Sequence, residues 1–252
     1  MRDSFYFGIP LISAAAANDW QRVNQLLRDT LHSVQAQEDG NFRVIIVGDD
    51  APIGWREGFG QDERFVFVAA NAARSAPTGA NDDAGVKRWM IRKWVKDAGG
   101  GLLMLLDADD LVDRATVRMA RERMRGDVRA AVIGKGVAID WVSGYALELP
   151  HAEVYEGAFH TLCGSSTIAR IAPNDDPFDA LGSHHRWPEN AAEQEIDLIR
   201  LPLWGGYRVN SDQNHSETHG PYAAWRQWFN RAVVEHGAPL SPALQHRLAF
   251  TA

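Results

Sequence analysis

The chain has 252 residues, of which 45% are hydrophobic and 23% are charged, and its formal net charge is −7 at pH 7. These values are ordinary for a globular protein, and the negative charge disfavours duplex nucleic acid as a partner, because phosphate binding needs a clustered basic surface. The single cysteine, Cys163, excludes an intramolecular disulfide, so nothing points to an oxidising compartment.

The apolar segments are too short to cross a membrane. None of them approaches the roughly 18 consecutive apolar residues that a spanning helix needs. The residues after Met1 pass straight into a strand-like run and show no signal-peptide pattern. We therefore expect a cytoplasmic protein, with loose peripheral association with a membrane left open.

The first half of the sequence alternates between strand and helix patterns. Apolar runs predict buried strands at residues 5–12, 42–47, 65–69 and 102–106. Helical spacing of apolar residues predicts helices at residues 23–34, 86–95 and 117–124. Asn18 is the expected N-cap of the first helix because Gln21 completes a capping box, and Asp113 is expected to open the third. This alternation predicts a mostly parallel sheet with helices on both faces.

The second half has a different pattern. Residues 130–149 predict two or three strands in a hairpin arrangement, and the Pro-, Asp- and His-rich residues 172–188 predict a loop. A short helix is expected at residues 189–201 and an amphipathic helix at residues 225–236. We expect no independent second domain, because this half has to fold against the first sheet.

Three aspartates directly follow the apolar run 102–106, in the segment Asp107-Ala108-Asp109-Asp110. In a parallel sheet, ligands bind beyond the carboxyl ends of the strands. Carboxylates at that place need compensation, because burying unpaired charge is costly. Mg²⁺ and Mn²⁺ provide it, since both favour oxygen ligands and commonly bind one or two carboxylates together with substrate phosphates. The segment therefore predicts a site for a divalent metal and a diphosphate.

The alternative interpretation is an acidic turn that caps the helix expected near Asp113. The apolar strand before the segment and the capped helix after it favour the metal site over this alternative.

Four segments in this order resemble glycosyltransferase family 2 and related GT-A enzymes. Residues 9–13 (I-P-L-I-S) look like the family's first strand, and residues 31–35 (L-H-S-V-Q) look like the end of its first helix. Residues 44–50 (V-I-I-V-G-D-D) look like its second strand, and residues 105–110 (L-L-D-A-D-D) match its acidic motif. The acidic motif is the most specific of the four.

The resemblance implies a GT-A fold: an α/β fold with a Rossmann-like, mostly parallel central sheet flanked by helices and a smaller mixed β region in the second half. It implies a glycosyltransferase that takes a sugar from a UDP- or GDP-linked donor with Mn²⁺ or Mg²⁺ as cofactor, and passes it to a glycan or small-molecule acceptor. In a single domain of residues 1–252, residues 1–115 would bind the nucleotide sugar and residues 116–252 the acceptor.

The resemblance also assigns roles to single residues. Asp109 would be the main metal ligand, and Asp107 would reach the ribose or the metal. Substrate contacts would come from matched positions and from nearby basic residues, namely Pro10, Ile12, Ser13, Asp49, Asp50, Arg74, Lys87, Arg88 and Ala108. The basic residues have a competing interpretation as solvated side chains of a surface helix.

The sequence departs from the family pattern in places. Ser13 stands where the family has Asn, and the family's A-R-N segment before the acidic motif is not recognisable. The second half also lacks the usual Glu-Asp base motif followed by an aromatic residue.

Sugar transfer needs a base for the acceptor hydroxyl, or a retaining mechanism in which the leaving phosphate takes part. Candidates for the base cluster in residues 182–189. Glu189 is the carboxylate nearest the family's base position, and His184 and His185 are candidate bases or metal ligands. Adjacent histidines in a loop are often merely exposed, so the choice among the three stays open.

Residues 207–216 resemble the family's late Y-R-x-H region, in which a histidine completes the metal shell. The resemblance makes His215 a third metal ligand, with His219 as a weaker rival, and a neutral imidazole suits that role. The small-residue run 163–167 corresponds to the place where the family lines its acceptor pocket.

Two other functions fit parts of the sequence. A nucleotidyltransferase can share the layered fold and an acidic metal site, but residues 13–17 (S-A-A-A-A) lack the Gly-rich basic loop expected there. A non-catalytic nucleotide- or sugar-binding protein stays open because the base is not identified.

Overall fold

The computed structural model describes residues 3–70, 82–213 and 221–250. Its strands are β1 (Phe5–Pro10), β2 (Arg43–Gly48), β3 (Phe65–Ala69), β4 (Gly101–Leu105), β5 (Leu111–Val112), β6 (Ala130–Asp140), β7 (Tyr145–Leu149), β8 (Thr167–Ile171), β9 (Leu198–Val209) and β10 (Ala238–Pro239). Its helices are α1 (Trp20–Gln35), α2 (Asp82–Asp97), α3 (Thr116–Arg123), α4 (Phe159–Leu162), α5 (Pro177–Leu181), α6 (Trp187–Glu193), α8 (Ala223–His236) and α9 (Pro242–Leu248), with 3-10 turns η1 (Phe59–Gln61) and η3 (His184–Arg186).

The strands form one mixed sheet with the order β10-β7-β6-β8-β4-β1-β2-β3. Strands β4, β1, β2 and β3 are mutually parallel, as crossover helices require. From β8 onward the sheet becomes mostly antiparallel, because β8 runs against both β4 and β6. The predicted α/β fold is thus confirmed: a parallel N-terminal half continues into a mixed second half.

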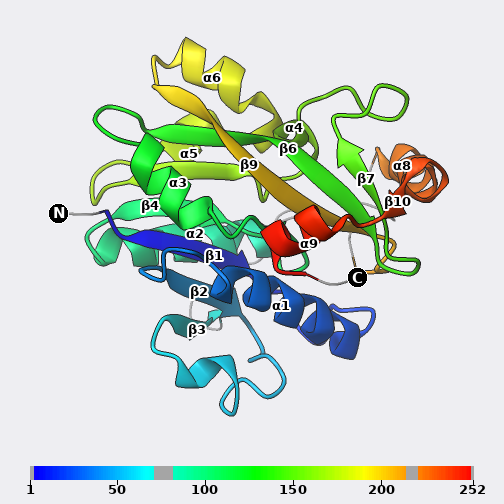
Figure 1. Cartoon of the computed structure of the whole chain (residues 1–252). Helices are drawn as coiled ribbons and strands as arrows, with labels where there is room; N and C mark the ends of the chain where they lie inside the picture. The colour runs from blue at the N-terminus through cyan, green and yellow to red at the C-terminus, as the bar shows by residue number, and fades with distance from the viewer. Residues whose placement is uncertain (1–2, 71–81, 214–220, 251–252) are drawn as a thin grey trace.

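Helices cover both faces of the parallel strands (Figure 1). Helices α1 and α3 pack on one face, where Leu27, Leu31 and Val117 join the largest apolar cluster with β1 and β2. Helix α2 packs on the other face, where Ile91 and Val95 meet side chains of the same strands. The sheet is therefore buried on both sides, and its polar groups can meet ligands only at the strand ends.

Several expected boundaries are wrong, for physical reasons. The N-cap of α1 is Asp19, not Asn18, because the Asp19 side chain accepts the hydrogen bond from the Arg22 N–H. Helix α3 begins at Thr116 rather than at Asp113, whose carboxylate instead accepts from Ala115 N–H in the preceding turn. The loop expected at residues 172–188 contains the short helix α5, which Asp176 caps ahead of Pro177.

The helix expected at residues 189–201 is also wrong at both ends. Helix α6 starts earlier, at Trp187, and stops at Glu193, and Leu198 already belongs to the long strand β9. Strand β9 runs parallel to β6 along most of its length and pairs antiparallel with β5. Pairing with β6 therefore overrides the local helical pattern of residues 198–201.

Strands β6 and β9 approach α4 closely through two glycines. A Cβ at Gly136 of β6 would overlap the ring of Phe159, and so would a Cβ at Gly205 of β9. Gly134, two residues earlier in β6, has open space at the same position. The buried Phe159 ring thus occupies the volume that two side chains would otherwise fill.

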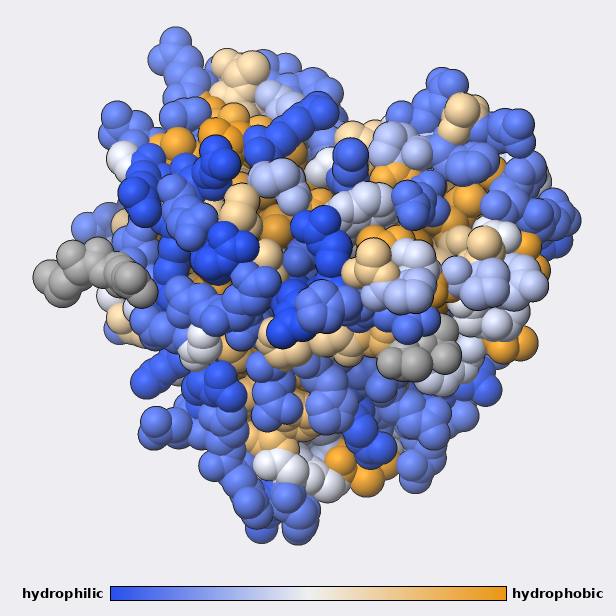
Figure 2. Space-filling view, in the orientation of Figure 1, coloured by the Kyte–Doolittle hydropathy of each residue, from blue (hydrophilic) through white to orange (hydrophobic). Residues whose placement is uncertain are grey.

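Figure 2 shows hydrophilic side chains over most of the face that carries α1, α3 and α9, with apolar surface visible between them. Within the described residues, every helix is too short or too polar to span a lipid bilayer.

Candidate functional site

Most of the residues that the sequence predicts to contact the nucleotide sugar lie at the carboxyl ends of the parallel strands. Strand β1 ends at Pro10, which lies in register with Val47 of β2. Ile12 and Ser13 follow β1, and both are partly buried. Asp49 follows β2, and Asp107 follows β4 after one further residue. The topology therefore brings these segments to one edge of the sheet.

Lys87 of α2 connects two of these strand ends. Its side chain is 1% exposed, and its ammonium donates a hydrogen bond of 2.8 Å to the Leu11 carbonyl. The same nitrogen lies 3.1 Å from the carboxylate of Asp49. Lys87 thus holds the ends of β1 and β2 together at the edge of the candidate site.

Asp50 orders the loop after β1. Its carboxylate accepts a hydrogen bond of 2.8 Å from the Ala14 backbone N–H. Asp49 and Asp50 are therefore directed differently: Asp49 faces α2, whereas the exposed Asp50 faces the β1–α1 loop.

The acidic segment is held by three neighbours. Arg88 of α2 lies 3.0 Å from the Asp107 carboxylate, and both side chains are almost half exposed. The Ser165 hydroxyl accepts from the Asp107 N–H at 2.8 Å. On the other side, the Thr30 hydroxyl of α1 donates to the Ala108 carbonyl at 3.0 Å. The backbone of the segment is thus fixed, while Asp107 and Asp109 keep partly exposed side chains.

Asp110 differs from the other aspartates because it is 2% exposed. The Cys163 thiol donates to its Oδ2 at 3.2 Å, and its Oδ1 has no hydrogen-bond partner within the described residues. Burial, and then the charges of Asp109 and Asp107, raise the pKa of Asp110 well above its usual value. Burial and the neighbouring Asp110 carboxylate likewise raise the pKa of the Cys163 thiol. These two groups hold the segment in place rather than facing a ligand.

His184 of η3 faces the acidic segment across Gly164. A Cβ at Gly164 would lie 3.5 Å from the His184 ring and 3.9 Å from Asp107 Oδ2. The Nδ1–H of His184 donates to the His160 carbonyl at 2.6 Å, which leaves Nε2 as the proton-accepting nitrogen. Burial is the largest cause that lowers the pKa of His184. The ring therefore favours the neutral form that a general base needs.

His185 and Glu189, the other two candidate bases, are exposed. The His185 Nδ1 hydrogen-bonds to the Ser183 hydroxyl at 2.8 Å, so that ring is held within its own turn. Glu189 lies in the first turn of α6, and its negative charge acts to raise the pKa of His160. Of the three candidates, the structure brings His184 next to Asp107.

Sequence reasoning missed Arg226 of α8. Its guanidinium donates to the Tyr207 hydroxyl at 3.0 Å and lies over the Tyr207 and Trp225 rings. Its charge contributes to lowering the pKa of His184. Arg226 lies in an amphipathic helix far from the motifs, so no signal in the sequence indicates that it lies near His184.

The donor set of the acidic segment fits a divalent cation that is completed by phosphate oxygens. Asp107 and Asp109 keep partly exposed carboxylates, whereas the buried Asp110 accepts from the Cys163 thiol, and Arg88 compensates Asp107. Within the described ranges, no three His, Cys, Asp or Glu side chains are grouped as a preformed metal site. Mg²⁺ and Mn²⁺ commonly bind one or two carboxylates together with substrate phosphates, so this arrangement suffices.

Two of the expected contacts lie outside the described residues. Arg74 falls in residues 71–81, and His215 falls in residues 214–220 together with its rival His219. Their proposed roles in diphosphate and metal binding stay predictions.

The chain is similar in structure, at low sequence identity, to nucleotide-diphospho-sugar transferases. A protein from Desulfovibrio desulfuricans G20 described as such a transferase is 13% identical, with a TM-score of 0.44 over 94% of this chain and 98% of that one. The inositol-1-phosphate CTP transferase from T. maritima is 9% identical, with a TM-score of 0.40 over 94% and 98%.

Glucosyl-3-phosphoglycerate synthase from Mycobacterium tuberculosis, in complex with Mn²⁺, UDP and glucosyl-3-phosphoglycerate, is also 9% identical. Its TM-score is 0.40 over 100% of this chain and 81% of that one. Glycosyltransferases and nucleotidyltransferases are both present among the similar structures, so the comparison does not separate the two reactions. No protein-family model and no curated protein sequence matches the chain.

Proposed function

We propose that this protein is a metal-dependent glycosyltransferase that moves a sugar from a nucleoside-diphosphate sugar to an acceptor hydroxyl. The observation that carries the proposal is the position of His184 across Gly164 from Asp107, at the carboxyl end of β4. A proton-accepting imidazole thus lies beside carboxylates of the kind that hold a metal–diphosphate group. This pairing joins the two parts that sugar transfer requires.

The donor would occupy the strand ends of residues 1–115. Asp109 and Asp107 would hold the cation, and His215 would be its third protein ligand. The bound cation would neutralise the charge that develops on the departing nucleoside diphosphate. Arg88 would also help to neutralise this charge, because its guanidinium lies 3.0 Å from the Asp107 carboxylate. The base and ribose of the nucleotide would contact Pro10, Ile12, Ser13, Asp49, Asp50 and Ala108.

Lys87 would act on the donor through its partners, because its buried ammonium is directed at Asp49 and the Leu11 carbonyl. It would hold the floor of the nucleotide pocket in shape, whereas Arg74 and Arg88 would reach the phosphates themselves. Preorganised positive groups of this kind lower the cost of binding a charged ligand.

The acceptor would lie between His184 and the residues 116–252 that surround it. His184 Nε2 would take the proton of the acceptor hydroxyl as the hydroxyl oxygen attacks the sugar. The His160 carbonyl, which accepts from Nδ1–H at 2.6 Å, keeps the ring in the tautomer that this step needs. Retention at the sugar would instead leave the proton to the departing phosphate and make His184 a positioning residue.

The test is donor turnover. The protein is incubated with UDP- and GDP-sugars and Mn²⁺, with and without acceptors, and free nucleoside diphosphate is measured. Release that is lost in Asp109→Ala supports the proposal. Pyrophosphate formation from a nucleoside triphosphate and a sugar phosphate would instead identify a nucleotidyltransferase, and metal-dependent nucleotide binding with no turnover of any donor would identify a binding protein.

A further inference from the structure

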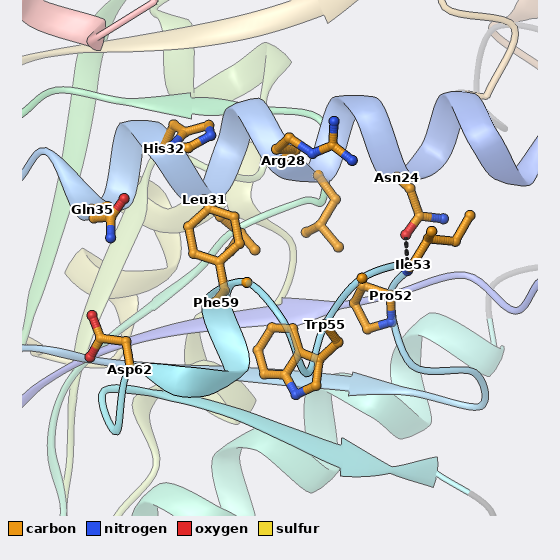
Figure 3. A pocket seen from close by; sticks show the side chains of 13 residues that line it. Asn24, Arg28, Leu31, His32, Gln35, Pro52, Ile53, Trp55, Phe59 and Asp62 are labelled. Atoms are coloured by element: carbon orange, nitrogen blue, oxygen red, sulfur yellow. Dashed lines mark hydrogen bonds between the residues drawn. The ribbon is translucent and has the colours of Figure 1, made fainter.

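A cavity of about 400 Å³ lies between α1 and the segment 52–62, on the side of α1 that faces the β3 edge of the sheet (Figure 3). Leu27 and Leu31 of α1 form one wall, and Pro52, Trp55 and Phe59 form the other. In Figure 2, apolar surface is visible in the lower part of the molecule, where α1 faces this segment. The volume lies within the range of small-molecule sites, which are mostly apolar and carry a few polar groups.

The walls of the cavity are fixed independently of any ligand. Segment 52–62 closes on itself through backbone hydrogen bonds, among them Gly58 N–H to the Gly54 carbonyl and Gly60 N–H to the Trp55 carbonyl. The Asn24 side chain ties its start to α1 by accepting from the Ile53 N–H at 2.7 Å.

Aromatic contacts fix the other end of the segment. The Phe59 ring lies 5.2 Å from the rings of both Phe65 and His32, centroid to centroid, and so spans β3 and α1. The Trp55 ring lies 6.3 Å from that of Phe67. The aromatic wall is therefore preformed, and a flat apolar group can enter without a rearrangement of the core.

The lining carries one uncompensated positive charge. Asp62 is paired with Arg64, whose guanidinium approaches it as closely as 2.6 Å. Arg28, on the α1 wall, is exposed and makes no hydrogen bond or ion pair within the described part of the chain. A ligand that combines a flat apolar body with one anionic group would bury the body against Trp55 and Phe59 and place the anion beside Arg28.

We propose that this cavity binds an organic anion with a flat, aromatic or conjugated apolar body. The site is separate from the donor site, because none of its lining residues belongs to the residues assembled around Asp107–Asp110. The proposal therefore stands or falls independently of glycosyl transfer.

The test uses 8-anilinonaphthalene-1-sulfonate, whose fluorescence rises in an apolar site, and N-phenyl-1-naphthylamine, which has the same aromatic body without the sulfonate. The folded 252-residue chain is expected to bind the sulfonate at least about fivefold more tightly than the neutral probe, since a charge-assisted contact adds this much or more. Arg28→Gln should remove the difference, and Arg28→Lys should keep most of it.

Two further variants locate the probe. Arg231→Gln is the matched control, because Arg231 is an exposed arginine of α8 and its loss changes the net charge equally. It should leave the sulfonate affinity unchanged. Trp55→Ala, checked by its melting curve to be folded, should weaken both probes by at least about fivefold.

Three results would overturn the proposal: no sulfonate binding to the folded protein, affinity that Arg28→Gln leaves unchanged, or displacement of the probe by UDP or GDP with Mn²⁺. The last result would place the probe in the donor site. Persistence of probe binding in Asp109→Ala, together with loss of the preference for the sulfonate in Arg28→Gln, supports the proposal whether or not the protein transfers a sugar.

Discussion

The ammonium of Lys87 lies 3.1 Å from the carboxylate of Asp49 and is buried, whereas Asp49 keeps 16% of its side chain exposed. This ion pair joins α2 to the end of β2. We expect Lys87→Met to lower the free energy of unfolding by about 2–3 kcal/mol, because Asp49 and the Leu11 carbonyl lose the buried ammonium that each of them contacts. Urea denaturation measures the change.

Lys93→Met is the control for this prediction. Lys93 lies on the same helix and pairs with Asp97 at 2.6 Å, but both side chains are more than half exposed. Its loss should change the unfolding free energy by less than about 0.5 kcal/mol. Equal effects of the two substitutions would contradict a structural role of the buried pair.

The metal site is tested by binding rather than by turnover. We expect Asp109→Asn to abolish the part of UDP or GDP affinity that depends on Mn²⁺, because an amide is a weaker ligand than a carboxylate for a hard cation. Calorimetric titrations with and without Mn²⁺ measure this part. An unchanged affinity in the presence of Mn²⁺ would refute the metal role of Asp109.

The three candidate bases can be separated by matched substitutions. We expect His184→Ala to lower kcat by about 10²-fold or more, the usual contribution of a positioned base. His185→Ala and Glu189→Gln should stay within about twofold of the wild type, since both side chains are exposed and His185 is held by Ser183 within its own turn. Near-normal turnover of His184→Ala with an active donor would show that another group takes the proton.

The contact between Gly136 and Phe159 predicts a specific packing penalty. Gly136→Ala should lower the unfolding free energy by about 1–3 kcal/mol, because the new methyl group overlaps a buried ring. Gly134→Ala, in the same strand but with open space, should change it by less than about 0.5 kcal/mol. In a Phe159→Leu background the cost of Gly136→Ala should shrink, and a double-mutant cycle measures that coupling. Additive effects would contradict the close approach.

His160 makes the stability of the fold depend on pH. Burial is the largest cause that lowers its pKa from 6.5 to about 4, followed by the charge of Arg200. The unfolded chain therefore takes up a proton below pH 6.5 that the folded chain refuses until about pH 4, so stability falls as the pH falls through this window.

The loss between pH 7 and pH 5 should be about 2 kcal/mol larger in the wild type than in His160→Phe, which has no group to protonate there. Unfolding in urea at the two pH values gives both differences. Parallel losses in the two proteins would show that His160 is not the group responsible.

The strands of the parallel half were predictable to within one or two residues. Each is a short, mostly apolar run, as at Phe65–Ala69, and buried parallel strands need no more than that. Strand β9 was not predictable, because Pro202, Gly205 and Gly206 are residue types that are disfavoured inside strands. The structure tolerates Pro202 where the pairing register with β6 shifts between Ile133 and Lys135, a place that needs no ladder N–H.

The donor side of the candidate site was predictable for a related reason. Asp49 and Asp107 directly follow strands, and the topology of parallel strands brings such residues to one edge. The proximity of His184 to Asp107 was not, since it depends on the turn at Gly164 and on the way η3 packs beside α4. No local pattern encodes a contact between residues so far apart in the chain.

The pairing of β5 with β9 has a consequence for how the protein can move. Strand β5 begins at Leu111, directly after the acidic segment, and its partner β9 is paired with β6 from Leu198 to Val209. A movement of residues 107–110 would therefore disturb the pairing of β5 with β9, and through β9 the pairing with β6. The backbone that carries these carboxylates is therefore rigid. Any closure around a ligand must come from the segments that approach the carboxylates from outside the sheet.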